Sequence, residues 1–224
     1  MTVTLDTYLV TQANLSAGRT TAEVVDAAID GGVDIVQVRE KHLSAADQLA
    51  VARELREPTA DAGVALVVND RVDVAVAADA DGVHLGDEDL PVAAAREQLG
   101  EDAIIGRSVS TVDAALAAEE AGADYLGVGA VYTTSSKDVD EAEQAIGLDT
   151  LTEIADAVEI PIVGIGGVTP DRAADVVEAG ADGVAVISAI TAADDPAGAT
   201  RALAEAVQEG KRQRGDDAAV EGSA

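Results

Sequence analysis

Short apolar runs alternate with alanine-rich segments of helical pattern along almost the whole chain. The apolar runs are hydrophobic on both faces, as expected for strands buried inside a parallel sheet. They predict strands at residues 7–10, 35–39, 65–68, 82–85, 104–108, 125–128, 162–165 and 183–187. The intervening segments predict helices at residues 21–30, 45–62, 71–78, 91–99, 112–121, 148–157, 170–179 and 196–209.

Strict alternation of strands and helices indicates a parallel sheet, because each helix forms the crossover between two parallel strands. For a chain of 224 residues, the α/β architecture that fits best is a single (βα)8 TIM barrel with a parallel eight-stranded core. A doubly wound open sheet is the alternative. A G-x-G-x-x-G pattern in the first turn would favour it, but Gly18 begins no such pattern. We therefore expect residues 1–209 to form one barrel domain.

Two further segments affect the fold prediction. The turns at residues 31–34, 79–82, 121–124 and 179–182 repeat a pattern of small residues with Asp before every second strand. We interpret this repeat as turn chemistry rather than as a binding site. Residues 210–224 lack apolar periodicity, and we expect them to form a disordered tail.

The charge of the chain is strongly negative, with 43 acidic and 14 basic residues and a net charge of −29. Such a surface repels nucleic acid and anionic lipid, so neither is expected as a partner. An acidic, solvated shell is typical of proteins that work in high salt, which screens the self-repulsion. The chain has no apolar run long enough to span a membrane, no secretory signal and no cysteine. These features predict a cytoplasmic protein without disulfides or thiolate chemistry, and they leave a homo-oligomer open.

A glycine-rich turn follows the seventh predicted strand. Gly164, Gly166 and Gly167 end that strand, and Ser188 follows the next one. Glycines let backbone N–H groups approach a ligand closely, and the loops after strands 7 and 8 of a barrel commonly bind phosphate. The sequence therefore predicts a phosphate site here, and the alternative is a tight turn without a ligand.

The second predicted strand carries charge at its C-terminal end. Because strand side chains alternate, Gln37, Arg39 and Lys41 share one face, while Val38 and Glu40 take the other. Two cations inside the barrel mouth would be costly if unpaired, so an anionic ligand is expected. The alternative is an internal ion pair with carboxylates.

Carboxylates follow the third strand, at Asp70, and the fourth strand, at Asp87, Glu88 and Asp89. Mg²⁺ prefers one or two carboxylates together with water and substrate phosphates. Asp70 and Asp89 are also placed to cap helices, which is the alternative. Beside Arg39 and Lys41, we favour a metal-bridged diphosphate site. His84 on the fourth strand is expected to be structural, as lone strand histidines usually are.

The long loop after the sixth strand contains hydroxyls followed by a lysine, in the segment Thr134, Ser135, Ser136 and Lys137. The chain has only three lysines, and Lys41 and Lys137 both lie in segments with other functional features. Hydroxyl donors and a lysine point charge can hold phosphate. We therefore expect this loop to take part in ligand binding.

Seven segments together resemble the thiamine-phosphate synthase family. They are QVREK at 37–41, ND at 69–70, DGVHLGDEDL at 81–90, GRS at 106–108, GAVYTTSSKD at 129–138, PIVGIGGV at 161–168 and GADGVAVIS at 180–188. The resemblance spans about residues 8–208. It implies an enzyme that joins 4-amino-5-hydroxymethyl-2-methylpyrimidine diphosphate to a thiazole phosphate or its carboxylated form, releasing diphosphate.

The resemblance also implies residue roles, carried over position by position. The pyrimidine diphosphate would contact Gln37, Val38, Arg39, Glu40, Lys41, Asn69, Ser108 and Lys137. Catalysis by charge stabilisation would fall to Arg39, Lys41, Lys137 and Ser108, and Mg²⁺ would be held by Asp70 and Asp89. The thiazole phosphate would contact Thr134, Ser135, Ser136, Gly167, Ile187 and Ser188. Asp87 and Thr133 depart from the family pattern, which usually has Gln and often Pro at these positions, and Asp87 would add a carboxylate near the metal.

Three alternatives remain at the level of sequence. A sugar-phosphate epimerase or isomerase needs a general base, and only two histidines and no evident buried glutamate are present to supply one. A tautomerase-like or regulatory relative within the same family would typically lack parts of the cationic strand and the metal carboxylates. A scaffold barrel would leave the inward cations unexplained.

Overall fold

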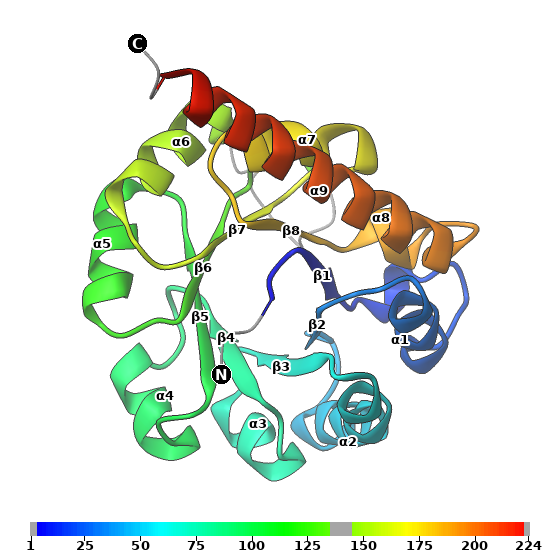
Figure 1. Cartoon of the computed structure of the whole chain (residues 1–224). Helices are drawn as coiled ribbons and strands as arrows, with labels where there is room; N and C mark the ends of the chain where they lie inside the picture. Colours follow the sequence, from blue (N-terminus) through cyan, green and yellow to red (C-terminus); the bar gives the residue numbers. More distant parts are fainter. Residues whose placement is uncertain (1–3, 135–144, 222–224) are drawn as a thin grey trace.

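The computed structural model describes residues 4–134 and 145–221, with side chains described to residue 215. The chain forms a closed parallel barrel in which each strand pairs with its sequence neighbours and the first pairs with the last (Figure 1). The strands are β1 (Thr7–Val10), β2 (Ile35–Val38), β3 (Ala65–Asn69), β4 (Gly82–Leu85), β5 (Ile104–Val109), β6 (Tyr125–Val128), β7 (Ile162–Ile165) and β8 (Gly183–Val186). The predicted (βα)8 barrel is confirmed, and each predicted strand is found to within one residue.

Helices surround the barrel (Figure 1). They are η1 (Ala13–Leu15), α1 (Thr21–Asp30), α2 (Ala45–Ala62), α3 (Val72–Ala78), α4 (Val92–Leu99), α5 (Val112–Glu120), α6 (Gly147–Ala157), α7 (Pro170–Glu178), α8 (Ser188–Thr191) and α9 (Pro196–Glu221). Local signals fix several starts. Thr20 and Glu23 form a capping box before α1, and the Ser44 hydroxyl accepts a hydrogen bond from the N–H of Asp47 at the start of α2. Within the described residues, no helix is both long and apolar enough to cross a membrane.

Two apolar clusters divide the core. The larger one lies between the sheet and the helices, and it includes Val36, Leu66 and Leu126. The smaller one fills the barrel interior, where Tyr8 and Tyr125 are among the largest fully buried side chains. Strand side chains alternate between these two clusters, so the inward residues at the C-terminal ends of the strands are the ones that can face a ligand.

The repeated Asp residues pair the strands at the opposite end of the barrel. Before each even-numbered strand, an Asp carboxylate accepts the backbone N–H of a residue at the start of the preceding odd-numbered strand. The pairs are Asp34 with Thr7 (2.9 Å), Asp81 with Leu66 (2.8 Å), Asp124 with Ile105 (2.6 Å) and Asp182 with Ile162 (2.9 Å). The repeat is therefore structural, and it joins the strands in four successive pairs.

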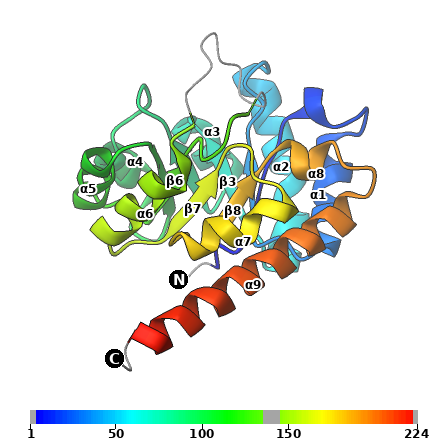
Figure 2. The ribbon, with the colours of Figure 1, turned by 90° about the horizontal axis from the view of Figure 1, so that it is seen from above.

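The end of the chain differs from the prediction of a disordered tail from residue 210. Helix α9 continues to Glu221 and its last turns extend past the barrel wall (Figure 2). Gly210 packs closely against α7, since a Cβ there would lie 2.6 Å from the Ala174 carbonyl oxygen. Lys211 pairs with Asp6, and Arg214 Nη1 donates to the Ala181 carbonyl oxygen at 3.0 Å. These contacts are distant in sequence, so the local pattern of residues 210–221 does not reveal them.

Candidate active site

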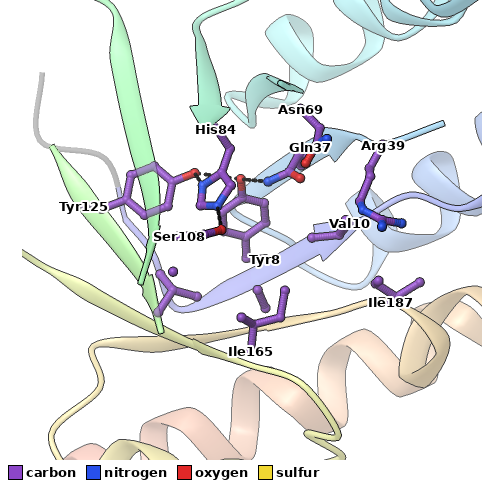
Figure 3. A pocket seen from close by; sticks show the side chains of 13 residues that line it. Tyr8, Val10, Gln37, Arg39, Asn69, His84, Ser108, Tyr125, Ile165 and Ile187 are labelled. Carbon is purple, nitrogen blue, oxygen red and sulfur yellow. Dashed lines mark hydrogen bonds between the residues drawn. The ribbon is translucent and has the colours of Figure 1, made fainter. Parts of the chain in front are cut away.

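A pocket opens into the barrel interior among the ends of the strands (Figure 3). Its walls combine polar groups with the apolar interior cluster. The polar lining residues are Tyr8, Gln37, Arg39, Asn69, His84, Ser108 and Tyr125, and the apolar ones include Val10, Val163, Ile165 and Ile187. The pocket thus joins Gln37, Arg39, Asn69 and Ser108, which the sequence assigns to one ligand.

Five polar side chains are hydrogen-bonded one to the next in a continuous row across the pocket wall, which we call the file (Figure 3). Gln37 Nε2 donates to the Tyr8 hydroxyl at 2.7 Å. The Tyr8 and Tyr125 hydroxyl oxygens are 2.8 Å apart. His84 Nδ1 lies 2.9 Å from the Tyr125 hydroxyl, and His84 Nε2 lies 2.8 Å from Ser108 Oγ. The file connects β2 to β5 through β1, β6 and β4.

Two glycines make room for this file. His84, Gly106 and Tyr125 are register partners on β4, β5 and β6. A Cβ on Gly106 would lie 2.1 Å from the Tyr125 ring and 2.5 Å from His84 Nδ1, and a Cβ on Gly127 would lie 2.9 Å from the His84 ring. Because β5 contributes no side chain at this level, His84 and Tyr125 meet directly across it.

Arg39 is buried, at 8% exposure, and is held by the loop after β1. Its Nη1 donates to Gln12 Oε1 at 2.9 Å, and its backbone N–H donates to Thr11 Oγ1 at 3.1 Å. A guanidinium held in this way lines the pocket in a fixed place, where it can face an anion.

Glu40 and Val38 turn away from the pocket, in agreement with their predicted face. The Glu40 carboxylate accepts hydrogen bonds from the Ala13 N–H at 2.9 Å and the Thr21 hydroxyl at 3.2 Å. The Val38 side chain packs in the outer cluster beneath the helices. Neither side chain faces a ligand in the pocket, so their contribution to the site is limited to the backbone and to holding the loop after β1.

The two proposed metal carboxylates lie together beside Lys41. Lys41 Nζ is 3.1 Å from Asp70 Oδ2, and Asp89 Oδ2 accepts the Gly86 N–H at 2.6 Å. Asp70 has a φ of 62°, a left-handed conformation that is uncommon outside glycine and that recurs at functional sites. Burial, with the neighbouring Asp70 carboxyl, raises the pKa of Asp89. Two adjacent carboxylates that resist carrying full charge together are a donor set that fits a divalent cation.

Asp87 was expected to add a carboxylate near these two. Its Oδ1 pairs with Arg107 Nη2 at 2.8 Å, and Arg107 also donates to the Gly86 carbonyl oxygen. Within the described residues, no cluster of three or more acidic, histidine or cysteine side chains is arranged to hold a metal. The assignment of Asp70 and Asp89 as metal ligands stays a prediction, and it rests on these two carboxylates alone.

A second pocket lies beside the first, at the ends of β7 and β8. Thr134, Gly167, Ile187 and Ser188 line it, as do Thr169 and Ala189. Gly166 and Gly167 have φ values of 100° and 65°, and a Cβ on Gly167 would lie 2.8 Å from the Thr133 carbonyl oxygen. The two pockets share Ala185 and Ile187. The phosphate cup predicted from the glycines thus has a cavity beside the charged strand ends.

Tyr132 and Arg172 connect the start of the loop after β6 to this cup. The Arg172 guanidinium lies 4.7 Å from the Tyr132 ring centroid, and Arg172 Nη1 donates to the Gly167 carbonyl oxygen at 3.1 Å. The Tyr132 N–H donates to the Gly166 carbonyl oxygen at 2.9 Å. Ser135, Ser136 and Lys137 lie outside the described residues, so their assignments stay predictions.

Sequence reasoning missed Tyr8, Tyr125 and His84. His84 was expected to be structural, yet it lines the pocket and contacts Ser108. A signal was present in the composition, because the chain has only three tyrosines and two histidines. Inward strand positions hold two of those tyrosines and one of those histidines, next to the glycines that accommodate them.

A closed (βα)8 barrel with a glycine-rich cup after β7 and β8 and a cationic strand end facing it defines a phosphate-binding barrel enzyme. The model of the thiamine monophosphate synthase family matches residues 7–190. The thiamine-phosphate synthase of Natronomonas pharaonis is 68% identical over 93% of this chain and 97% of that protein. The enzyme of Haloarcula marismortui is 61% identical over 92% of this chain and 98% of that protein.

Among solved structures, the thiamine phosphate pyrophosphorylase of Pyrococcus furiosus superimposes with a TM-score of 0.84 and 40% identity. The match covers 92% of this chain and 97% of that chain. This chain belongs to the thiamine monophosphate synthase family, and it is an enzyme that transfers a pyrimidine moiety to a thiazole phosphate.

Proposed function

We propose that the two pockets divide the thiamine-phosphate synthase reaction between them. The pocket in the barrel interior takes the pyrimidine diphosphate, and the pocket at the ends of β7 and β8 takes the phosphate of the thiazole. The observation that supports this division most is the placement of Arg39 and Lys41 on one rim, together with Asp70 and Asp89, facing a separate glycine-rich cup.

In this proposal, the diphosphate lies against the charged strand ends. Arg39 has a fixed guanidinium, and Lys41 is more exposed and paired with Asp70. Gln37, Asn69 and Ser108 line the deeper part of the same pocket, where the uncharged ring of the substrate would lie. Lys137, from the loop after β6, would add a further positive charge.

Asp70 and Asp89 would hold Mg²⁺. When bound, the metal neutralises charge on the diphosphate and so makes it a better leaving group. Such a metal would also offset the burial and the repulsion from Asp70 that together raise the pKa of Asp89. Lys41 already neutralises part of the charge on Asp70, so the site would balance two carboxylates, two cations and the diphosphate.

The proposed reaction requires the protein to stabilise charge and to position the two substrates. The bond between the pyrimidinylmethyl carbon and the diphosphate oxygen breaks, and both electrons leave with the diphosphate. The ring amino group stabilises the resulting cation, and the thiazole nitrogen then supplies the electron pair of the new C–N bond. Arg39, Lys41 and Lys137 would stabilise the negative charge that builds on the leaving diphosphate. The file of buried hydrogen bonds would hold the ring so that the two reacting atoms face each other.

The thiazole phosphate would rest on the cup formed by Thr134, Gly167, Ile187 and Ser188, and Ser135 and Ser136 are its further predicted contacts. Gly167 accommodates the close approach of the Tyr132–Thr133 backbone, and Ser188 begins α8. Both features leave backbone N–H groups near the pocket, which suits a phosphate. Retention of Arg39, Lys41, Asp70 and Asp89 favours the synthase over a tautomerase-like or regulatory relative.

Turnover with and without metal tests this proposal. The purified enzyme should form thiamine phosphate and diphosphate from the two substrates when Mg²⁺ is present, and it should lose this activity in a chelator. Asp70→Asn and Asp89→Asn should each raise the Mg²⁺ concentration needed for half-maximal rate by tenfold or more, on the order expected for loss of one charged ligand. Asp113→Asn, on the exposed first turn of α5, is the matched control. An unchanged metal requirement in both site variants would contradict the assignment.

The environment of the enzyme is also part of the proposal. The net charge of −29 and the relatives from halophilic archaea support a function in a high-salt cytoplasm. The same charge argues against nucleic acid or anionic membranes as partners, and a homo-oligomer stays open.

A further inference from the structure

The file Gln37–Tyr8–Tyr125–His84–Ser108 begins and ends on side chains that line the pocket. Its inner members have few ways to arrange their protons. Each phenol carries one proton, and burial favours this neutral form because it raises the pKa of Tyr8 to about 12 and raises the pKa of Tyr125 well above its usual value. A phenol that accepts a hydrogen bond from one neighbour satisfies its own buried proton only by donating it to the other.

At one end of the file, the structure determines which group donates the hydrogen bond and which accepts it. Gln37 presents Nε2, a donor only, to the Tyr8 oxygen at 2.7 Å. Tyr8 then donates to Tyr125, and Tyr125 donates to His84 Nδ1, which must lack a proton. The remaining ring proton of a neutral His84 is on Nε2, and it points to Ser108 Oγ at 2.8 Å. The Ser108 hydroxyl thus accepts from the protein, and its own proton is left for the pocket.

We propose that Tyr8, Tyr125 and His84 are positioning residues that lock this direction, so that Ser108 presents a hydrogen-bond donor to the pocket and Gln37 presents its Oε1 acceptor. In the described part of the chain, neither the Ser108 hydroxyl proton nor Gln37 Oε1 has a protein partner. Reversing the file would change both ends together, because every member would exchange the roles of donor and acceptor.

The locked file makes the pocket selective by hydrogen-bond pattern, a consequence that rests on the proposed function. A ring that offers an acceptor to Ser108 and a donor to Gln37 Oε1 satisfies both ends. An amino-substituted pyrimidine has this pattern, with a ring nitrogen beside an N–H group. The corresponding oxo-pyrimidine has the reversed pattern and would leave the buried Gln37 Oε1 and the half-buried Ser108 hydroxyl unsatisfied, so it should bind about tenfold or more weakly.

The tautomer of His84 tests the direction without any substrate. The chain has only two histidines, His42 and His84, so ¹⁵N-histidine labelling and two-bond ¹H–¹⁵N correlation spectra resolve each ring, and His42→Asn assigns them. At neutral pH and high salt, we expect His84 to be a neutral ring with its proton on Nε2. A proton on Nδ1, or on both nitrogens, would overturn the proposal.

A variant tests whether the file, and not the ring alone, sets the tautomer. Tyr125→Phe removes the donor to His84 Nδ1, so we expect His84 to become a mixture of the two tautomers while Tyr132→Phe leaves it unchanged. An unchanged single Nε2–H tautomer in Tyr125→Phe would show that the file does not lock it. Circular dichroism checks the fold, and if the variant does not fold, the wild-type spectrum still decides the direction.

Kinetics then separate this proposal from the proposed function. We expect Tyr125→Phe to raise KM for the pyrimidine diphosphate about tenfold, roughly one hydrogen bond, and to leave KM for the thiazole phosphate unchanged. Equal changes in both KM values would contradict the positioning role. If wild-type enzyme shows the expected tautomer but no turnover with the two substrates, the file stands and the proposed function fails.

Discussion

At the scale of single residues, burial inside the barrel keeps the two phenols of the pocket wall in their neutral form. Tyr8 and Tyr125 are 1% exposed, and their ring centroids are 6.0 Å apart. Desolvation is the largest cause of the raised pKa of both residues. A buried phenolate would cost more than a buried phenol, so the folded state keeps both protons to higher pH than the unfolded chain does.

This difference predicts a loss of stability in alkali. The stabilisation is fully present below the unfolded pKa of about 10 and is lost as pH rises toward the folded pKa, which is about 12 for Tyr8. Each buried phenol should lower the free energy of unfolding by up to about 1.4 kcal/mol per pH unit above pH 10. Denaturant unfolding at constant salt measures this slope of the free energy of unfolding against pH. Tyr8→Phe should reduce the slope by the contribution of one buried phenol. Parallel pH curves for the two proteins would argue against the raised pKa.

Some of the candidate site residues can be predicted from the sequence, and others cannot. Arg39, Asp70 and Asp89 are visible because charged residues at strand ends need a reason to be there. His84 is not visible in that way, because its role depends on Gly106 leaving a gap between β4 and β6. Such a gap is a property of register across three strands, which no single segment of the sequence contains.

At the scale of elements, the barrel is built from strand pairs that carboxylates hold at one end. Asp34 accepts the Thr7 N–H, and the same arrangement recurs before β4, β6 and β8. The two pockets lie toward the opposite ends of these strands. The fold therefore separates the residues that hold the strands in place from those that line the pockets.

Asp34 offers a test of these strand pairs. Asp34→Ala should lower the free energy of unfolding by about 1–3 kcal/mol, because the Thr7 N–H loses its acceptor. Asp34→Asn keeps an oxygen there and should be nearly neutral at pH 7. Burial raises the pKa of Asp34, so the ionised carboxylate costs stability. The free energy of unfolding of the wild type should therefore increase relative to that of Asp34→Asn as pH falls through the folded pKa. Equal unfolding midpoints for the alanine and asparagine variants would count against the pairing role.

The strands and most helices are predictable because buried parallel strands are apolar on both faces and helices carry clear caps. Two elements are not. The four-residue helix α8 is too short for a periodic pattern. The last turns of α9 are held by Lys211 and Arg214 through contacts with Asp6 and the Ala181 carbonyl oxygen, which are distant in sequence. Local patterns predict an element when its stability is local, and they fail when distant contacts supply it.

The molecule as a whole carries its excess negative charge on the outside. The core between the sheet and the helices is apolar, while the net charge of the chain reaches −29. Ion pairs neutralise some of the carboxylates, as between Arg56 and Asp81 and between Arg96 and Asp124. The remaining carboxylates repel one another across the surface, and dissolved salt screens this repulsion.

Salt should therefore raise the stability of the whole molecule. We expect the Tm to increase by about 10 °C or more between dilute buffer and molar KCl, equivalent to about 3 kcal/mol for a domain of this size. Thermal unfolding followed by circular dichroism measures the shift. Sucrose at matched osmolality serves as a control without screening. A protein that is equally stable in dilute buffer would contradict a high-salt adaptation.

The central claim is that the cations at the barrel mouth stabilise the leaving diphosphate. The most direct test is kcat/KM for the pyrimidine diphosphate in Arg39→Ala and Lys137→Ala, with Arg201→Ala on the exposed face of α9 as the control. Removing one preorganised contact typically costs on the order of 10²–10³ in rate, so each site variant should lose at least about tenfold with its fold intact, while the control stays at the wild-type value. Turnover close to wild type in both site variants would contradict the account.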